Sequence, residues 1–192
     1  MMIEALIFPI VIGKIRGGKI KNLFNIFINK WWFIVVAALI EFTVSFIRIK
    51  EIGSIWKVIN NNIFWIHMIT YSLIIVVLFI NIRKKGFKSV MIGVILNFLV
   101  IMVNGGRMPV DVRGIENMIS QESLQILKTG KDLTHKLADD STKLSFLGDI
   151  IHIKKPYPIP KSISVGDIFM ILGVFMFIQG KMITKEQIKV SH

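Results

Sequence analysis

Long apolar runs separated by short polar stretches are the main pattern along this chain. Residues 31–47 contain a single charged residue, Glu41, residues 63–82 contain a single histidine, His67, and residues 89–103 contain neither kind. An α-helix rises 1.5 Å per residue, so a run of roughly 17–25 apolar residues matches the hydrocarbon thickness of a bilayer. The pattern therefore predicts helices that cross a membrane.

Five such segments are expected, and the first differs from the others. The predicted segments are residues 2–15, 31–47, 63–82, 89–103 and 165–179. The first is short and contains Pro9, and it can span if Lys14 and Arg16 extend their charged groups to the headgroups. We predict an all-α membrane protein, with residues 1–192 forming a single integral-membrane domain: a bundle of about five transmembrane helices. If the first segment only dips into the bilayer, four helices remain.

The positive charge of the chain is gathered beside the apolar runs. The sequence has 24 lysines and arginines and 12 acidic residues, which gives a formal net charge of +12. Basic clusters lie at 13–30, at 83–88 and in the C-terminal tail (Lys181, Lys185 and Lys189). Because basic loops stay in the cytoplasm, we predict a multi-pass membrane protein with its N-terminus outside and its C-terminus cytoplasmic. This placement of the charge beside the apolar runs speaks against nucleic acid as a partner. If the first segment does not span the membrane, the four remaining helices would put both termini in the cytoplasm.

A long polar loop, residues 104–162, precedes the last apolar segment. It carries nine basic and seven acidic residues, a nearly balanced charge that favours an extracytoplasmic position. Between Ser120 and Gly130, a polar cap at one end and a glycine at the other predict a short helix. The chain has no cysteine, which excludes disulfides, thiolate metal sites and cysteine nucleophiles. We expect neither a metal nor a cofactor.

The start of this loop is the first candidate binding site. The sequence Asn-Gly-Gly-Arg-Met-Pro-Val at 104–110 places two glycines, Gly105 and Gly106, between Asn104 and Arg107. One interpretation is a helix stop, because glycine is common after a last helical turn. The other is a group of backbone N–H donors beside Arg107 that would bind an anionic headgroup or a carboxylate.

Three aspartates, Asp111, Asp149 and Asp167, form the second candidate site. Asp167 follows Ser164 by three residues, which predicts a capping box at the start of the last helix. Asp149 is expected to be solvated or to pair with Lys154. The alternative is that two of the three aspartates share a proton and activate water.

Polar residues inside the predicted membrane segments also need partners. Glu41 is costly in lipid and should face the interior of the bundle. His67 is expected to form an interhelical hydrogen bond, with Asn97 or Thr70 as its partner. The functional alternative is a path for protons or cations through Glu41 and His67.

Several of these motifs together resemble a known but uncharacterised family. They are Gly-Lys-Ile-Arg-Gly-Gly at 13–18, the Asn-Gly-Gly-Arg-Met-Pro-Val stretch, and the Leu-Gly-Asp to Ser-Val-Gly-Asp run that closes the loop. The resemblance is to a bacterial domain of unknown function in multi-pass membrane proteins. It implies a location in the bacterial plasma membrane and no particular activity. Asp167 is also placed like a catalytic aspartate of lipoprotein signal peptidases, although Ser164-Val-Gly-Asp differs from the motif of those enzymes.

The leading functional hypothesis is a non-enzymatic membrane subunit that binds a ligand, a lipid or a partner protein. Glycine, proline and charge concentrate at the outer ends of the last two helices, so Arg107, Asp149 and Asp167 are expected near the site. Membrane lipid is the expected partner, with a second copy of the chain or another membrane protein as further candidates. The alternatives are an intramembrane aspartyl hydrolase and a small transport or substrate-capture subunit.

Overall fold

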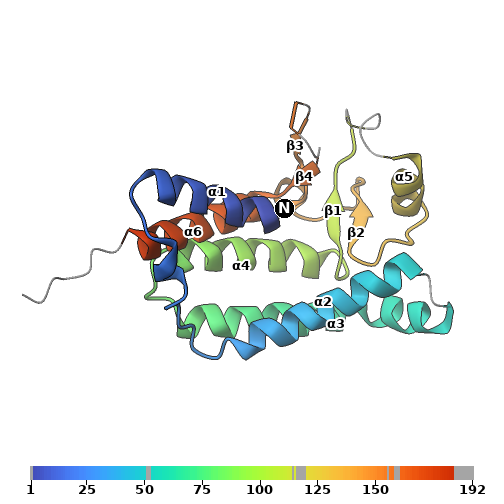
Figure 1. Ribbon diagram of the computed structural model, residues 1–192. Helices are drawn as coiled ribbons and strands as arrows, with labels where there is room; N and C mark the ends of the chain where they lie inside the picture. Colours follow the sequence, from blue (N-terminus) through green and yellow to red (C-terminus); the bar gives the residue numbers. More distant parts are fainter. Residues whose placement is uncertain are drawn as a thin grey trace, which may run out of the picture.

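Five long helices packed side by side make up most of the protein (Figure 1). The structure is a computed structural model that describes residues 2–50, 53–113, 115, 120–154, 156–157 and 161–183. The long helices are α1 (Met2–Ile15), α2 (Trp32–Lys50), α3 (Gly53–Ile80), α4 (Phe87–Val103) and α6 (Val165–Met182). Helix α1 packs on α6, α6 on α4, α4 on α3 and α3 on α2. The helices therefore follow the order α1–α6–α4–α3–α2 across the molecule.

The contact between α4 and α6 is built on glycines. Gly86 and Gly93 on the α4 side face Gly173 and Gly166 on α6, and each pair of glycines is seven residues apart. A Cβ atom on Gly93 would collide with the carbonyl oxygen of Gly166, and one on Gly173 would collide with the side chain of Val90. Small residues let helix backbones approach closely, which is a common way to pack helices in membranes.

Two of the described helices are long and apolar enough to cross a membrane. They are Ser54–Ile80 and Val165–Met182, and the shorter apolar helical stretches are Ala5–Ile15, Trp32–Ile47 and Phe87–Val103. Large apolar side chains face outward on the helices, and Phe42 and Phe79 are 69% and 71% exposed. The mostly helical prediction is thus confirmed in its general form, while the count of five spans remains a prediction.

The observed helix bounds differ most from the predicted ones at α3. The third segment was expected over residues 63–82, but α3 begins ten residues earlier, at Gly53. The added turns contain Lys57 and three consecutive asparagines at 60–62, so they carry no long apolar run. These residues have low helix propensity on the whole, so contact with α2 is what extends the helix beyond its apolar part.

The loop between α4 and α6 is a folded cap at one end of the helices (Figure 1). Its elements are strand β1 (Met108–Val110), helix α5 (Gln121–Lys128), strand β2 (His135–Leu137), the 3-10 turn η2 (Ser145–Leu147) and strands β3 (Ile151–Ile153) and β4 (Lys161–Ile163). Strand β1 pairs in parallel with β2, and β3 pairs antiparallel with β4. Ser120 caps α5 as predicted, but the short strands have no clear signal in the sequence.

Basic residues gather at the opposite end of the helices. The backbone N–H of Lys19 donates to the carbonyl of Met182, and Arg16 donates to the side chain of Gln179. A 3-10 turn, η1 (Ile20–Leu23), lies in the connection between α1 and α2. The turn between α3 and α4 contains Arg83, Lys84 and Lys85. The described residues at this end include no acid. Lys185 and Lys189 of the predicted basic tail lie outside the described residues.

Candidate functional site

A polar cavity of about 390 Å³ lies where α2, α3, α4 and α6 meet the folded loop. Its charged and polar lining comes from segments far apart in the sequence. The lining residues are Glu41, His67, Thr70, Tyr71, Ile74, Asn97, Ile101, Met108, Thr134, His135, Asp149, Ser162 and Asp167. Three carboxylates and two imidazoles therefore face one partly open space, which we call the polar cavity.

Glu41 and His67 form the part of the cavity wall made by α2 and α3. His67 is 3% exposed, and its Nε2 lies 3.7 Å from a carboxylate oxygen of Glu41. Its Nδ1 donates to the carbonyl of Gly106 at 2.5 Å. The predicted partners of His67, Asn97 and Thr70, are therefore wrong. Gly106 takes that place because its φ of +86° and its close approach to the backbone of Phe64 turn its carbonyl toward the ring.

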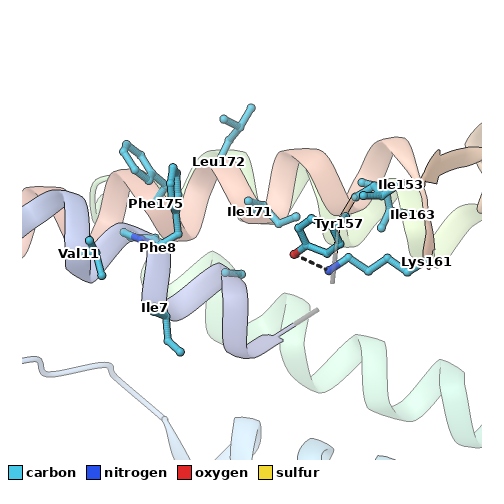
Figure 2. Close-up of a pocket in the computed structure, with 12 residues that line it drawn as sticks. Ile7, Phe8, Val11, Ile153, Tyr157, Lys161, Ile163, Ile171, Leu172 and Phe175 are labelled. Carbon is cyan, nitrogen blue, oxygen red and sulfur yellow. Dashed lines mark hydrogen bonds between the residues drawn. The ribbon is translucent and has the colours of Figure 1, made fainter. Parts of the chain in front are cut away.

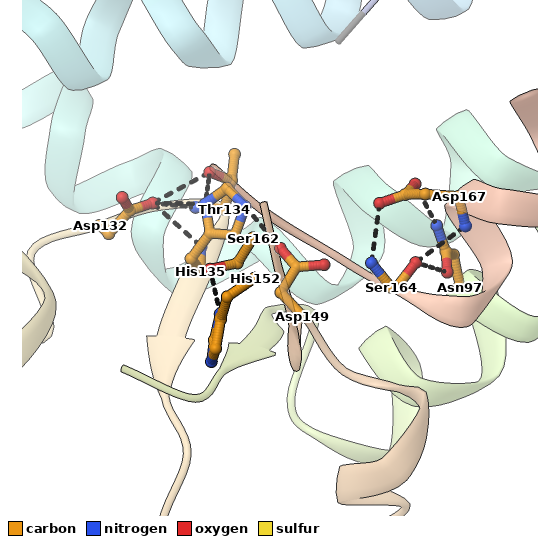
Figure 3. Close-up of polar contacts among 9 residues, drawn as sticks. All are labelled: Asn97, Asp132, Thr134, His135, Asp149, His152, Ser162, Ser164 and Asp167. Atoms are coloured by element: carbon orange, nitrogen blue, oxygen red, sulfur yellow. Dashed lines mark hydrogen bonds and ion pairs between the residues drawn. The ribbon is translucent and has the colours of Figure 1, made fainter. Parts of the chain in front are cut away.

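His135 lies between two aspartates on the loop side of the cavity (Figure 3). Its Nε2 is 3.8 Å from Oδ2 of Asp149, and its Nδ1 is 3.6 Å from Oδ1 of Asp132. Nδ1 also forms a 2.8 Å hydrogen bond with the hydroxyl of Thr134. Asp132 in turn accepts hydrogen bonds from the backbone N–H groups of Thr134 and His135, which fixes this turn of the chain.

The two aspartates beside His135 have opposite acidities. Burial raises the pKa of Asp149 to about 7, an effect that the charge of Asp167 increases and that of His135 opposes. Burial also disfavours the charged form of Asp132. Hydrogen bonds and the charge of His135, together with the backbone donors, nevertheless hold the pKa of Asp132 well below its usual range. Asp132 is thus an anchored anion, whereas Asp149 can gain or lose a proton near neutral pH.

Asp167 is held in a buried network at the start of α6. Its two oxygens accept hydrogen bonds from the side chain of Asn97, at 3.1 Å, and from the backbone N–H of Ser164, at 3.0 Å. The hydroxyl of Ser164 accepts from the N–H of Asp167 and donates to the Asn97 carbonyl oxygen (Figure 3). The predicted capping box is therefore confirmed, and Asn97 ties it to α4.

Two buried carboxylate oxygens at the cavity accept no hydrogen bond, although the one on Glu41 lies 3.7 Å from Nε2 of His67. One oxygen of Glu41 and Oδ1 of Asp149 have no hydrogen-bond partner among the described residues. A buried acceptor without a donor costs free energy, so this arrangement favours a ligand that brings donors or positive charge. The described residues contain no group of three histidine, aspartate or glutamate side chains placed to hold a metal ion.

The other predicted site residues lie outside the polar cavity. Asn104 joins the end of α4 to the loop through hydrogen bonds with Lys143. Arg107 donates to the side chain of Asn60 on α3, and its burial lowers its pKa. Together with Gly106, whose carbonyl accepts from His67, three of the four candidates at the start of the loop therefore hold the loop against the helices.

Asp111 and Gly105 are surface features of the same loop. Asp111 forms an ion pair with Arg113 at 2.7 Å, and these bonds hold the pKa of Asp111 below its usual range. Gly105 has a φ of +73° and open space where a Cβ atom would lie, as expected of a turn residue. The helix-stop interpretation therefore describes Gly105 better than a binding role does.

The polar residues at or near the cavity that have no counterpart in the sequence-based prediction are Tyr71, Asp132, Thr134, His135 and Ser162. The only signal for them is the Asp-Leu-Thr-His order at 132–135, because aspartate often accepts hydrogen bonds from the backbone two and three residues later. That signal marks a turn. It does not show that the turn returns to α3 and α6.

Comparisons with known proteins place the chain among uncharacterised sequences. Residues 25–179 match a family described as a family of unknown function (DUF5317). An uncharacterised protein of Thermotoga maritima is 34% identical over 97 residues, which cover 50% of this chain and 52% of that protein. The chain thus matches about half the length of this relative. No solved structure matches the chain.

Proposed function

Because this chain belongs to the DUF5317 family of unknown function, we propose its function from its own geometry: an integral membrane protein that binds a small organic cation in the polar cavity. The observation that carries the proposal is the pair of buried carboxylate oxygens on Glu41 and Asp149 that accept no hydrogen bond from the described residues. A primary ammonium group supplies three N–H donors and a positive charge, which matches both oxygens.

The shape and lining of the cavity favour an organic ligand over a bare ion. A volume of about 390 Å³ falls in the range of small-molecule sites. Ile74, Ile101 and Met108 offer apolar contacts, and the ring of Tyr71 can contact a cation. The ligand expected here is therefore an amine that carries a short carbon chain.

Membrane location is supported by the outer surface of the helices. Apolar side chains such as Phe42, Leu39 and Phe79 are exposed on them, and water would make that exposure costly. The basic residues collect at one end and the folded loop at the other, as the positive-inside rule requires of five alternating spans. We propose that the cavity end faces outward.

The alternatives from the sequence have less support. Both oxygens of Asp167 already accept hydrogen bonds, so this carboxylate is poorly placed to share a proton with Asp149 in an aspartyl hydrolase. Arg107 does not line the cavity, which disfavours an anionic ligand there. Glu41 and His67 line the same cavity as Asp149, so we assign them to the ligand site and not to a separate path for ions.

Thermal unfolding of the purified protein in mild detergent tests the proposal. We expect ethanolamine and putrescine, added at pH 8 and constant ionic strength, to raise the Tm, whereas uncharged ethylene glycol does not. A ligand at about 100 times its Kd stabilises by ~2.7 kcal/mol. Phosphatidylethanolamine in mixed micelles serves as a further probe, because its headgroup carries the same ammonium group and shows whether the amine comes from a lipid.

Matched carboxylate variants locate the binding site. Asp149→Asn combined with Glu41→Gln should abolish the amine-dependent rise in Tm. Asp111→Asn should keep it, because the Asp111 carboxylate pairs with exposed Arg113 outside the cavity. If no amine raises the Tm of the unaltered protein, or if Asp111→Asn loses the effect equally, the proposal is wrong.

A further inference from the structure

An apolar groove of about 690 Å³ runs between α1 and α6, separate from the polar cavity (Figure 2). Helix α1, helix α6 and the β3–β4 hairpin supply its walls. The lining residues are Ala5, Ile7, Phe8, Pro9, Val11, Ile153, Tyr157, Lys161, Ile163, Ile171, Leu172 and Phe175. All of them are apolar except Tyr157 and Lys161, which we call the polar end of the groove.

The groove exists because α1 and α6 approach closely at one end and separate toward the other. Near the basic end, Gly13 packs directly against Met182, and the side chain of Gln179 donates to the carbonyl of Pro9 at 2.6 Å. Farther along, the rings of Phe8 and Phe175 are 6.3 Å apart. The space beyond this aromatic pair opens toward the hairpin (Figure 2).

The helical walls of the groove are short. On α6 the lining runs from Ile171 to Phe175, and on α1 it runs from Ala5 to Val11. At 1.5 Å per residue, the six-residue rise along α1 is about 9 Å, which fits within one leaflet of a hydrocarbon core of ~30 Å. A partner transmembrane helix would need a face along the whole helix, whereas part of an acyl chain from one leaflet needs only this short stretch.

The polar end has the chemistry of a headgroup site. Nζ of Lys161 lies 3.4 Å from the hydroxyl of Tyr157 and 4.9 Å from the centre of its ring. Between Asp149 and Asp167 the sequence contains Lys154, Lys155 and Lys161 and no acid. Tyrosine and lysine are typical of the membrane interface, and lysine binds phosphate as a point charge.

We propose that this groove binds one anionic phospholipid of the leaflet on the loop side, with an acyl chain between α1 and α6 and its phosphate at Lys161. The site shares only the membrane location with the proposed cation site, because the two have no lining residue in common. A lipid held here would fill the gap left where α1 and α6 diverge. It would thereby link α1 to the β3–β4 hairpin.

Native mass spectrometry of the protein in detergent tests this inference with two probes, phosphatidylglycerol and phosphatidylcholine. We expect one phosphatidylglycerol to be retained in preference to phosphatidylcholine. Leu172→Trp, which fills the groove, should reduce retention at least tenfold, because acyl-chain burial supplies most of the binding. Lys161→Gln should weaken it about fivefold, and Lys161→Arg should restore it.

Two controls make the same chemical changes elsewhere. Leu39→Trp places a large side chain on an exposed face of α2, and Lys154→Gln removes a lysine of the hairpin that does not line the groove. Both should retain phosphatidylglycerol as the unaltered protein does. Equal retention of the two lipids, unchanged binding in Leu172→Trp, or equal losses in the controls would overturn the inference. A photoreactive group placed at position 172 gives a second measurement: if it cross-links the chain to another protein and not to a lipid, the inference is also overturned.

Discussion

Asp149 is the residue whose ionisation state most affects the site. The pKa of a buried carboxyl rises because burial disfavours the charge, and the pKa of Asp149 is about 7. In the unfolded chain the same group has its ordinary pKa of about 3.9. Between these values the folded protein keeps a proton that the unfolded chain releases. Unfolding is therefore favoured progressively as the pH rises from about 4 to about 7.

Replacing Asp149 with asparagine should remove this pH dependence. Asp149→Asn and the unaltered protein should have similar stability at pH 4, because the carboxyl is then protonated in the folded state and the unfolded chain has only begun to release its proton. At pH 8 the variant should be more stable, by on the order of 2–4 kcal/mol, since a shift of three pKa units is worth ~4 kcal/mol at most. Thermal unfolding in detergent at the two pH values measures the difference.

Asp111 provides the control for this experiment. Its bonds with Arg113 lower its pKa, so any stability that it contributes is present above pH 4 and lost as the pH falls below that. Asp111→Asn should therefore not gain stability at pH 8. If Asp149→Asn gains none either, the carboxyl of Asp149 is solvated and the geometry described for it is wrong.

At the level of helices, the glycine contact between α4 and α6 should tolerate no added side chain. A Cβ on Gly166 would collide with Asn97 and disturb the network of Asp167, and one on Gly93 would collide with the α6 backbone. We expect Gly166→Ala and Gly93→Ala to lower the free energy of unfolding by about 1–3 kcal/mol, as overpacking does in well-packed cores. Thermal unfolding of each variant measures this loss.

Gly180→Ala is the matched change in the same helix. Its Cβ would meet only the flexible side chain of Lys85, which can move aside. Alanine also has a higher helix propensity than glycine, so this variant should be as stable as the unaltered protein or slightly more so. A similar loss in all three variants would mean that the α4–α6 contact has no special role.

The sequence predicts the helices well and the site only in part. Apolar runs locate α2, α4 and α6 within a few residues, because burial and lipid contact both depend on such runs. They miss the polar first turns of α3. The pairing of His135 with Asp149 is not predictable from local pattern, because it depends on parallel pairing of strands β1 and β2, which 24 residues separate in the sequence.

At the level of the whole molecule, the absence of cysteine allows a direct test of orientation. Gln125 in α5 and Asn25 in the basic connector are both exposed and uncharged. In intact bacterial cells that express single-cysteine variants, a membrane-impermeant thiol reagent should label Gln125→Cys and not Asn25→Cys. Labelling of both positions should occur after the cells are lysed.

A cysteine placed ahead of Met2 separates the five-span topology from the four-span alternative. It should be labelled from outside if α1 crosses the membrane, and only after lysis if α1 stays on the cytoplasmic side. Labelling of Asn25→Cys but not Gln125→Cys in intact cells would reverse the proposed orientation. A protein that remains monodisperse in buffer without detergent would contradict the membrane location altogether.

The helix order places α1 at one edge of the row, where it packs chiefly on α6. No lining residue of the polar cavity comes from α1, whereas one wall of the apolar groove is made by it. The range matched by the family begins at residue 25, after α1. The two surfaces are thus built by different parts of the chain. We therefore expect substitutions in α1 to change lipid retention at the groove while leaving amine binding in the polar cavity intact.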